Sequence, residues 1–100
     1  MQAKPQSMQI ESIQVESQPS EERLTELGVH NWPTWSKQPS EFPWVYDDPE
    51  TCYFLAGDVE VMPEDGETVR VGQGDLVIFP AGMSCRWRVL QPVKKHYSFG

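Results

Sequence analysis

The chain has 100 residues, of which 38% are hydrophobic, and a formal net charge of −7 at pH 7. This length suits one domain with a modest core, and the acidity argues against a surface that follows nucleic-acid phosphates. The chain has no apolar run near the roughly 18 residues of a membrane span, no secretory signal and only two cysteines, so we expect a cytoplasmic protein with neither a membrane nor a nucleic acid as its partner.

The N-terminal part of the chain is polar and predicts little regular structure. Residues 1–8 have the composition of a disordered leader, so we expect a single domain over residues 9–100. Ile10, Ile13 and Val15 follow, and the alternation of apolar and polar residues from Ile13 predicts a short, half-buried strand.

A short helix is predicted over residues 21–27, EERLTEL. Ser20 is a favourable N-cap, acidic residues occupy the first turn, and Gly28 is a typical stop. Leu24 and Leu27 are its apolar anchors.

Between residues 29 and 46 the chain places Trp32, Trp35 and Trp44 among three prolines. Prolines at this density exclude a helix and a central strand, which predicts an extended edge segment lying over a sheet. The tryptophans then form either a satellite hydrophobic cluster or a surface for a ligand or partner.

Strand patterns dominate the rest of the chain, separated by turns rich in glycine and proline. Gly57 is predicted to turn the chain, and Pro92 to separate the last two strands. Cys85, Trp87 and Val89 point one way while the arginines between them point the other. Many short strands with hardly any helix predict an all-β sandwich or barrel. The predicted strands cover residues 44–46, 50–56, 59–61, 68–71, 76–79, 85–89 and 93–99.

Two motifs in this half of the chain resemble the paired motifs of the RmlC-like cupin superfamily. The first is ETCYFLAG, from Glu50 to Gly57, and the second is GDLVIFPAGMSC, from Gly74 to Cys85. The sequence around these motifs, including the preceding segment NWPTW and the following segment KHY, is similar to that of the small single-domain cupins of the ureidoglycine aminohydrolase cupin-domain family. The resemblance implies an all-β cupin jelly-roll β-barrel with a short N-terminal helix.

In metal-binding cupins, three histidines and the motif glutamate converge on one divalent metal inside the barrel. Here the histidine positions carry Trp44, Tyr46 and Cys85, and only Glu50 remains. Tryptophan offers no lone pair, and a neutral phenol is a poor ligand. Even with Cys52, the remaining donors fall short of a stable site. We therefore expect no metal and no other cofactor, and we do not expect the aminohydrolase reaction, which needs its metal, to carry over.

The cupin register places a group of side chains inside the barrel, either as a filled core or as the wall of a pocket for a small, planar or partly aromatic molecule. A carboxylate among aromatic rings is costly to bury unless it is paired, which makes Glu50 a candidate acid or base with Tyr46 as its hydrogen-bond partner. The candidate pocket residues are Trp44, Tyr46, Glu50, Cys52, Phe54, Cys85 and Trp87, with Val89 as a further possibility.

Three functions remain open from the sequence. The first is binding of an unknown small molecule by a cupin that lacks the usual histidine-rich metal site. The second is an isomerase- or hydrolase-like enzyme with Glu50, Tyr46 and Cys85 as catalytic residues. The third is a structural or interaction module with a filled core. Cys85 as a nucleophile needs a base, for which His96 is the candidate. In the last strand either His96 or its neighbours Lys95 and Tyr97 can point inward, but not both.

Two surface features complete the expectations. Arginines at 86 and 88 with Lys94 and Lys95 predict a basic patch on the outer face or rim, which is either a solvated surface or an entrance that attracts an anion. Cupin-like sheets pair edge to edge, so the strand near Val15 suggests a homodimer.

Overall fold

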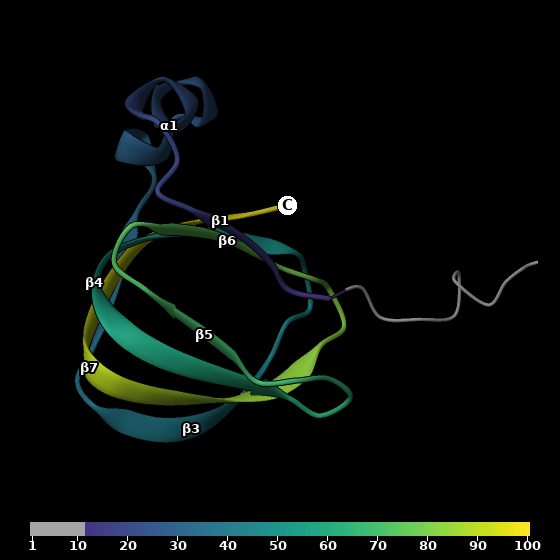
Figure 1. Ribbon diagram of the computed structural model, residues 1–100. Coiled ribbons are helices and arrows are strands. Elements are labelled where there is room, and N and C mark those ends of the chain that lie inside the picture. Colours follow the sequence, from purple (N-terminus) through teal and green to yellow (C-terminus); the bar gives the residue numbers. More distant parts are fainter. Residues whose placement is uncertain (1–11) are drawn as a thin grey trace, which may run out of the picture.

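The computed structural model describes residues 12–100, which form seven strands, one short helix and one turn of 3-10 helix (Figure 1). The predicted leader and Ile10 lie outside the described residues. The described chain is all-β apart from these short helices, as predicted. The elements are β1 (Gln14–Ser17), α1 (Glu21–Leu27), η2 (Val29–Asn31), β2 (Thr34–Lys37), β3 (Ser40–Val45), β4 (Glu50–Pro63), β5 (Val69–Gly72), β6 (Asp75–Phe79) and β7 (Ser84–Phe99).

Two long antiparallel strands, β4 and β7, form the backbone of the barrel. They pair along most of their length, from Glu50 opposite Phe99 to Pro63 opposite Cys85. The first half of β4 also pairs with β6, and its second half pairs with β5. On its other edge β7 pairs first with β3 and then with β2, and β1 extends the sheet beyond β6. The shared strands therefore curl the sheet into a barrel, seen along its axis in Figure 1.

The predicted turn at Gly57 is wrong, because β4 runs through it as a bend. The register between β4 and β7 shifts three times between Phe54 and Val59. Gly57 has a φ of 117°, and a Cβ at this position would lie 2.7 Å from the Cα of Val93 on β7. Irregular pairing bends a strand, and only glycine allows the two backbones to approach so closely. The glycine thus forms a corner of the barrel.

Pro92 does not end a strand either, since β7 continues through it. The edge of β7 is paired with β3 up to Val89 and with β2 from Val93. Pro92 lies in the gap between these two partners, where no ladder hydrogen bond is required from its nitrogen.

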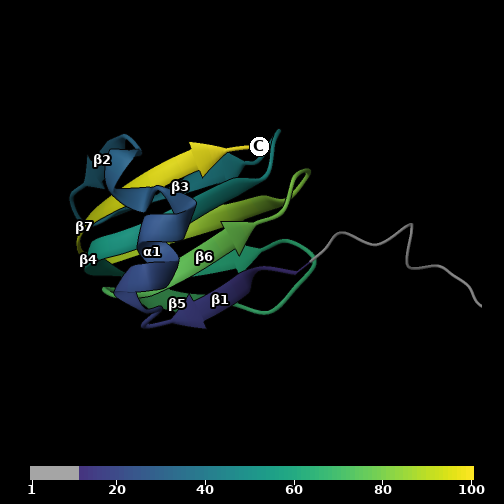
Figure 2. The same cartoon turned by 90° about the horizontal axis from the view of Figure 1, so that it is seen from above.

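The helix is confirmed with its predicted ends. The Ser20 side chain accepts a hydrogen bond from the backbone N–H of Arg23, and Gly28 closes the helix with a φ of 76°. Leu24 is buried, whereas Leu27 is exposed, so one of the two predicted anchors holds the helix. α1 lies on the outside of the barrel, over β4 and β6 (Figure 2). Within residues 12–100, no helix is long and apolar enough to cross a membrane.

The segment rich in tryptophan and proline is extended and lies at an edge, as predicted, and supplies both β2 and β3. Trp35 lies opposite Lys95 on β7, and Pro43 lies opposite Arg86. Trp35 is half-buried and packs edge to face on Trp87, with ring centroids 5.8 Å apart. It therefore joins the main core and does not form the satellite cluster.

The core occupies the inside of the barrel, and the predicted faces of its strands are confirmed. On β7, Cys85, Trp87 and Val89 are buried, while Arg86 and Arg88 are exposed. The buried core cluster consists of Tyr46, Cys52, Phe54, Val59, Val61, Val71, Val77, Phe79, Met83, Cys85, Trp87, Val89 and Val93.

Candidate functional site

A cavity of about 190 Å³ lies between the β2–β3 edge and the C-terminal half of β7. Of the described side chains that line it, seven are aromatic and two are charged. Trp44 and Phe99 retain 44% and 58% of their exposure, which places them at the mouth. The lining residues are Trp35, Phe42, Trp44, Tyr46, Glu50, Trp87, Lys95, Tyr97 and Phe99.

The two charged side chains form a buried ion pair. Glu50 is the first residue of β4 and faces inward, as do Cys52 and Phe54 after it. Lys95 lies opposite Phe54 on β7, so it also faces inward, and its Nζ donates to Glu50 Oε2 over 2.9 Å. The two side chains are 5% and 6% exposed. Such a pair is stable in a protein interior only with good geometry and further hydrogen bonds.

Cys52 and two indole rings complete the surroundings of this ion pair. Lys95 Nζ donates to Cys52 Sγ over 3.1 Å, and the thiol donates to Glu50 Oε2 over 3.2 Å. The ammonium also lies 5.1 Å from the ring centre of Trp35 and 4.9 Å from that of Trp87. Cation–π contacts of this kind stabilise a cation that has left water. The floor of the cavity is therefore a fixed, overall neutral pair of opposite charges.

Tyr46 does not bond to Glu50, contrary to the sequence interpretation. Its Oη accepts a hydrogen bond from Trp87 Nε1 over 3.2 Å, and its ring stacks on Phe79 with centroids 4.9 Å apart. Burial, and then the nearby negative charge of Glu50, raise the pKa of the Tyr46 phenol well above its usual range. Tyr46 therefore keeps its proton.

Both cysteines are free thiols held in their neutral form. Burial raises the pKa of Cys52 to about 12, although Lys95 opposes this effect, and burial together with Glu64 raises the pKa of Cys85 to about 11. His96, the base considered for Cys85, instead places its Nδ1 2.9 Å from the backbone oxygen of Trp32. These contacts do not activate Cys85 as a nucleophile, because a nucleophilic cysteine needs a lowered pKa.

The predicted pocket residues divide into two groups. Trp44, Tyr46, Glu50 and Trp87 line the cavity. Cys52, Phe54, Cys85 and Val89 are buried in the core but are not part of the cavity wall.

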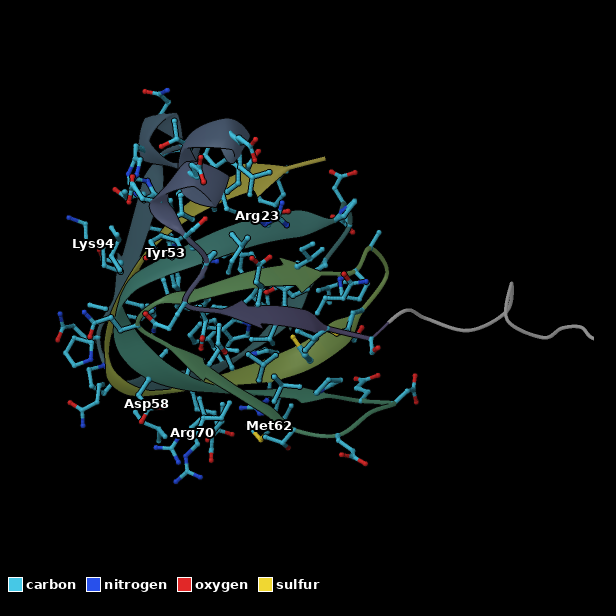
Figure 3. All side chains as sticks on the ribbon, turned by 45° about the horizontal axis from the view of Figure 1, so that its top comes forward. Arg23, Tyr53, Asp58, Met62, Arg70 and Lys94 are labelled. Carbon is cyan, nitrogen blue, oxygen red and sulfur yellow. The ribbon has the colours of Figure 1, made fainter. Side chains whose placement is uncertain are left out.

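Lys95 is buried. The sequence had placed it either in an outer basic patch or, as the alternative to His96, inside the barrel, and it was not among the predicted pocket residues. Its neighbour Lys94 does point away from the barrel (Figure 3). The alternation of Cys85, Trp87 and Val89, continued past the proline in steps of two, leads to Lys95 and could have found it. Phe42 and Phe99 line the cavity and were missed. Trp35 and Tyr97 also line it; the sequence had left open a ligand surface for Trp35 and an inward side chain for Tyr97.

The donor set does not fit a divalent metal. Of the four positions that hold the metal in other cupins, only Glu50 carries a hard ligand, and its Oε2 already bonds to the Lys95 ammonium. In the part of the chain that the structure describes, no three His, Cys, Asp or Glu side chains lie together as a metal-binding group.

An antiparallel barrel of two long shared strands, with an inward glutamate beside a cavity, has the architecture of a cupin. The model of the EutQ-like cupin domain matches residues 24–97. The chain therefore belongs to the EutQ-like cupin family, and the predicted all-β cupin fold is confirmed.

Solved structures agree with this assignment. The chain is 52% identical to a DUF861 family protein from Thermotoga maritima, with a TM-score of 0.86, over 89% of this chain and all of the other. It is 27% identical to a putative ethanolamine utilization protein Q from Salmonella typhimurium (TM-score 0.60), over 66% of this chain and 53% of the other. A DUF861 family protein from Pseudomonas syringae is 26% identical (TM-score 0.60), over 67% of this chain and 29% of the other. The chain thus spans about half or less of the last two proteins. No curated protein matched the chain.

Proposed function

We propose that this cupin binds a small organic molecule in the aromatic cavity above the Glu50–Lys95 pair, without a histidine-rich metal site. The cavity itself is the observation that supports this function most. An apolar cavity of about 150 Å³ is enough for one benzene molecule. At about 190 Å³, this one has room for a single ring with small substituents.

The character of the wall favours a binding site over a filled structural core. Protein interiors are packed to the density of organic crystals, and a void surrounded by aromatic rings loses packing energy. A buried ion pair is weak support for stability, since an apolar pair of the same volume often does as well. A cavity and an ion pair at the same place are explained together if a ligand occupies one and is oriented by the other.

A second candidate is acid–base catalysis by Glu50, in an isomerase- or hydrolase-like reaction. The specific observation is that the protein contacts of the carboxylate go to Oε2, which leaves Oε1 without a hydrogen-bond partner among residues 12–100. The neighbouring cation is Lys95, which takes the supporting role that the sequence suggested for Tyr46 or Cys85. The proposed similarity to the ureidoglycine aminohydrolase subgroup concerns the fold alone. The metal-dependent reaction of that subgroup is not part of the proposed function.

A ligand screen with matched rim variants tests the proposal. Bacterial and plant metabolites are screened by thermal shift, and each hit is titrated against the wild type, Trp44→Ala and Val45→Ala. Trp44 lines the cavity, whereas Val45, which is also exposed, is next to it on β3 and is not part of the wall. We expect at least about a tenfold weaker affinity for Trp44→Ala and no change for Val45→Ala. Hits that are indifferent to Trp44, or a screen without hits, would contradict binding at this site.

A direct measurement addresses the metal. Elemental analysis of the purified wild type and of Glu50→Gln should find no stoichiometric transition metal in either. One equivalent of metal in the wild type that disappears in Glu50→Gln would overturn this part of the proposal.

A further inference from the structure

Glu50 and Lys95, at the floor of the cavity, each have a hydrogen-bonding group without a partner among the described side chains. An ammonium has three N–H bonds, and Lys95 uses one toward Glu50 Oε2 and one toward Cys52 Sγ. One N–H of Lys95 is therefore free of partners among the described side chains, and so is Glu50 Oε1. Both residues line the cavity, so this donor and this acceptor belong to two contacting side chains of its wall.

Tyr46 adds a second donor. Its oxygen accepts from the Trp87 indole, and its own O–H donates to no partner within residues 12–100. Because the phenol holds its proton, Tyr46 can offer a hydrogen bond to a ligand but cannot accept a proton from one.

The charge of the site selects a neutral ligand. Glu50 and Lys95 cancel, and among residues 12–100 no other charged side chain is part of the wall. An anion that bonds to Lys95 would bring a second negative charge beside Glu50, and a cation that bonds to Glu50 would lie beside Lys95. Either charge would also lose its hydration among aromatic rings, which is costly without a free counter-charge.

The wall selects a flat ligand. Phe42 and Trp87 are stacked with centroids 6.0 Å apart, and Trp35 meets both rings edge to face. Aromatic faces and edges pack best against another flat ring. The cavity volume limits the ligand to one ring with small substituents.

From these features we propose that the ligand is a neutral, planar ring that carries an N–H and a C=O on neighbouring atoms, as in a lactam or cyclic imide. The N–H of the ligand donates to Glu50 Oε1, and its carbonyl oxygen accepts from Lys95 Nζ. The Tyr46 O–H donates to a second acceptor atom on a ring that carries one. This assignment rests on the proposed binding function and specifies the chemical class of the ligand.

Four small probes test the class, because they share a six-membered ring and differ in charge and in hydrogen bonding. They are 2-pyridone, N-methyl-2-pyridone, benzoate and benzylamine, titrated into the full-length protein by ligand-observed NMR. We expect 2-pyridone to bind at least about tenfold more tightly than each of the others, because the N-methyl compound leaves Glu50 Oε1 unpaired and the ions add an uncompensated charge.

Variants with matched controls assign the contacts. Glu50→Gln and Lys95→Met should each weaken 2-pyridone at least about tenfold. Lys94→Met, the outward neighbour, and Glu60→Gln, the outward glutamate of β4, should leave its affinity unchanged. If a single variant unfolds, the Glu50→Gln/Lys95→Met double variant, which leaves no unpaired charge, serves instead and should lose the preference for 2-pyridone over its N-methyl form.

The outcomes separate this proposal from the proposed function. If benzoate or benzylamine binds best and Trp44→Ala abolishes that binding, the cavity is a ligand site but the neutral lactam class is wrong. Equal binding of 2-pyridone and its N-methyl form would overturn the role of Glu50 Oε1. If none of the four probes binds while the metabolite screen gives hits that depend on Trp44, the class is again overturned and the binding function stands.

Discussion

Removing one partner of the Glu50–Lys95 pair should destabilise the fold far more than removing both. At 2.9 Å and an effective dielectric constant of about 20, the attraction between the two charges is about 6 kcal/mol. The cost of taking both charges out of water offsets most of this, so the intact pair adds little net stability. A single substitution leaves one unpaired buried charge, which costs about 3–5 kcal/mol.

A double-mutant cycle measures this difference. Urea unfolding followed by tryptophan fluorescence gives the free energy of unfolding for the wild type, Glu50→Gln, Lys95→Met and the double variant. We expect losses of about 3–5 kcal/mol for each single variant and about 2 kcal/mol or less for the double variant, hence a coupling of at least about 4 kcal/mol. The partly exposed pair of Arg88 and Glu60, 3.6 Å apart, is the control and should show a coupling below about 1 kcal/mol. Losses at Glu50 and Lys95 that add within about 0.5 kcal/mol would refute the buried pair.

Three further predictions concern the glycine at the barrel corner, Gly57, and the two buried thiols, Cys52 and Cys85. Gly57→Ala should lower the free energy of unfolding by more than Gly82→Ala does in the same urea assay. Both glycines have positive φ, but only at Gly57 would the added Cβ lie 2.7 Å from a backbone atom, the Cα of Val93. Equal losses for the two variants would contradict this close approach. The free energy of unfolding should fall as pH rises above 9. The ordinary thiol pKa is 9.0, whereas the folded pKa values of Cys85 and Cys52 are raised to about 11 and about 12, so the unfolded chain releases these protons first. Urea unfolding at several pH values checks this, and a constant free energy of unfolding between pH 9 and 11 would count against it. For the same reason iodoacetamide at pH 8 should modify both thiols much more slowly in the folded protein than in urea, and fast labelling of folded Cys85 would revive it as a candidate nucleophile.

The barrel could be predicted from the sequence because its determinants are local. The cap of α1 at Ser20, the alternation of Cys85 and Trp87, and the motif glycines each act within a few residues. The predicted turns at Gly57 and Pro92 were wrong because both residues also occur within bent strands. Whether a glycine turns or bends a strand is decided by its contacts across the sheet, here with Val93.

The cavity could be predicted only in part, for a related reason. Trp44, Tyr46 and Glu50 follow from the cupin motifs, but the ion pair depends on the register that places Lys95 opposite Phe54 and Trp35. That register joins residues more than 40 positions apart, and no short-range pattern encodes it. Because Pro92 was taken as a break, the alternation of the preceding strand was not used to decide whether His96 or its neighbours Lys95 and Tyr97 point inward.

The position of the charged pair on the shared strands also determines how a molecule reaches it. Glu50 is hydrogen-bonded between β6 and β7, and Lys95 between β4 and β2, so neither backbone segment can separate without opening the whole barrel. Entry and exit must therefore use the mouth, where the exposed Trp44 and Phe99 need only change rotamer. Such side-chain motions take place in nanoseconds, whereas opening of a central sheet is as rare as global unfolding. Exchange between the cavity and water should accordingly be limited by the affinity of the occupant and not by movement of the protein.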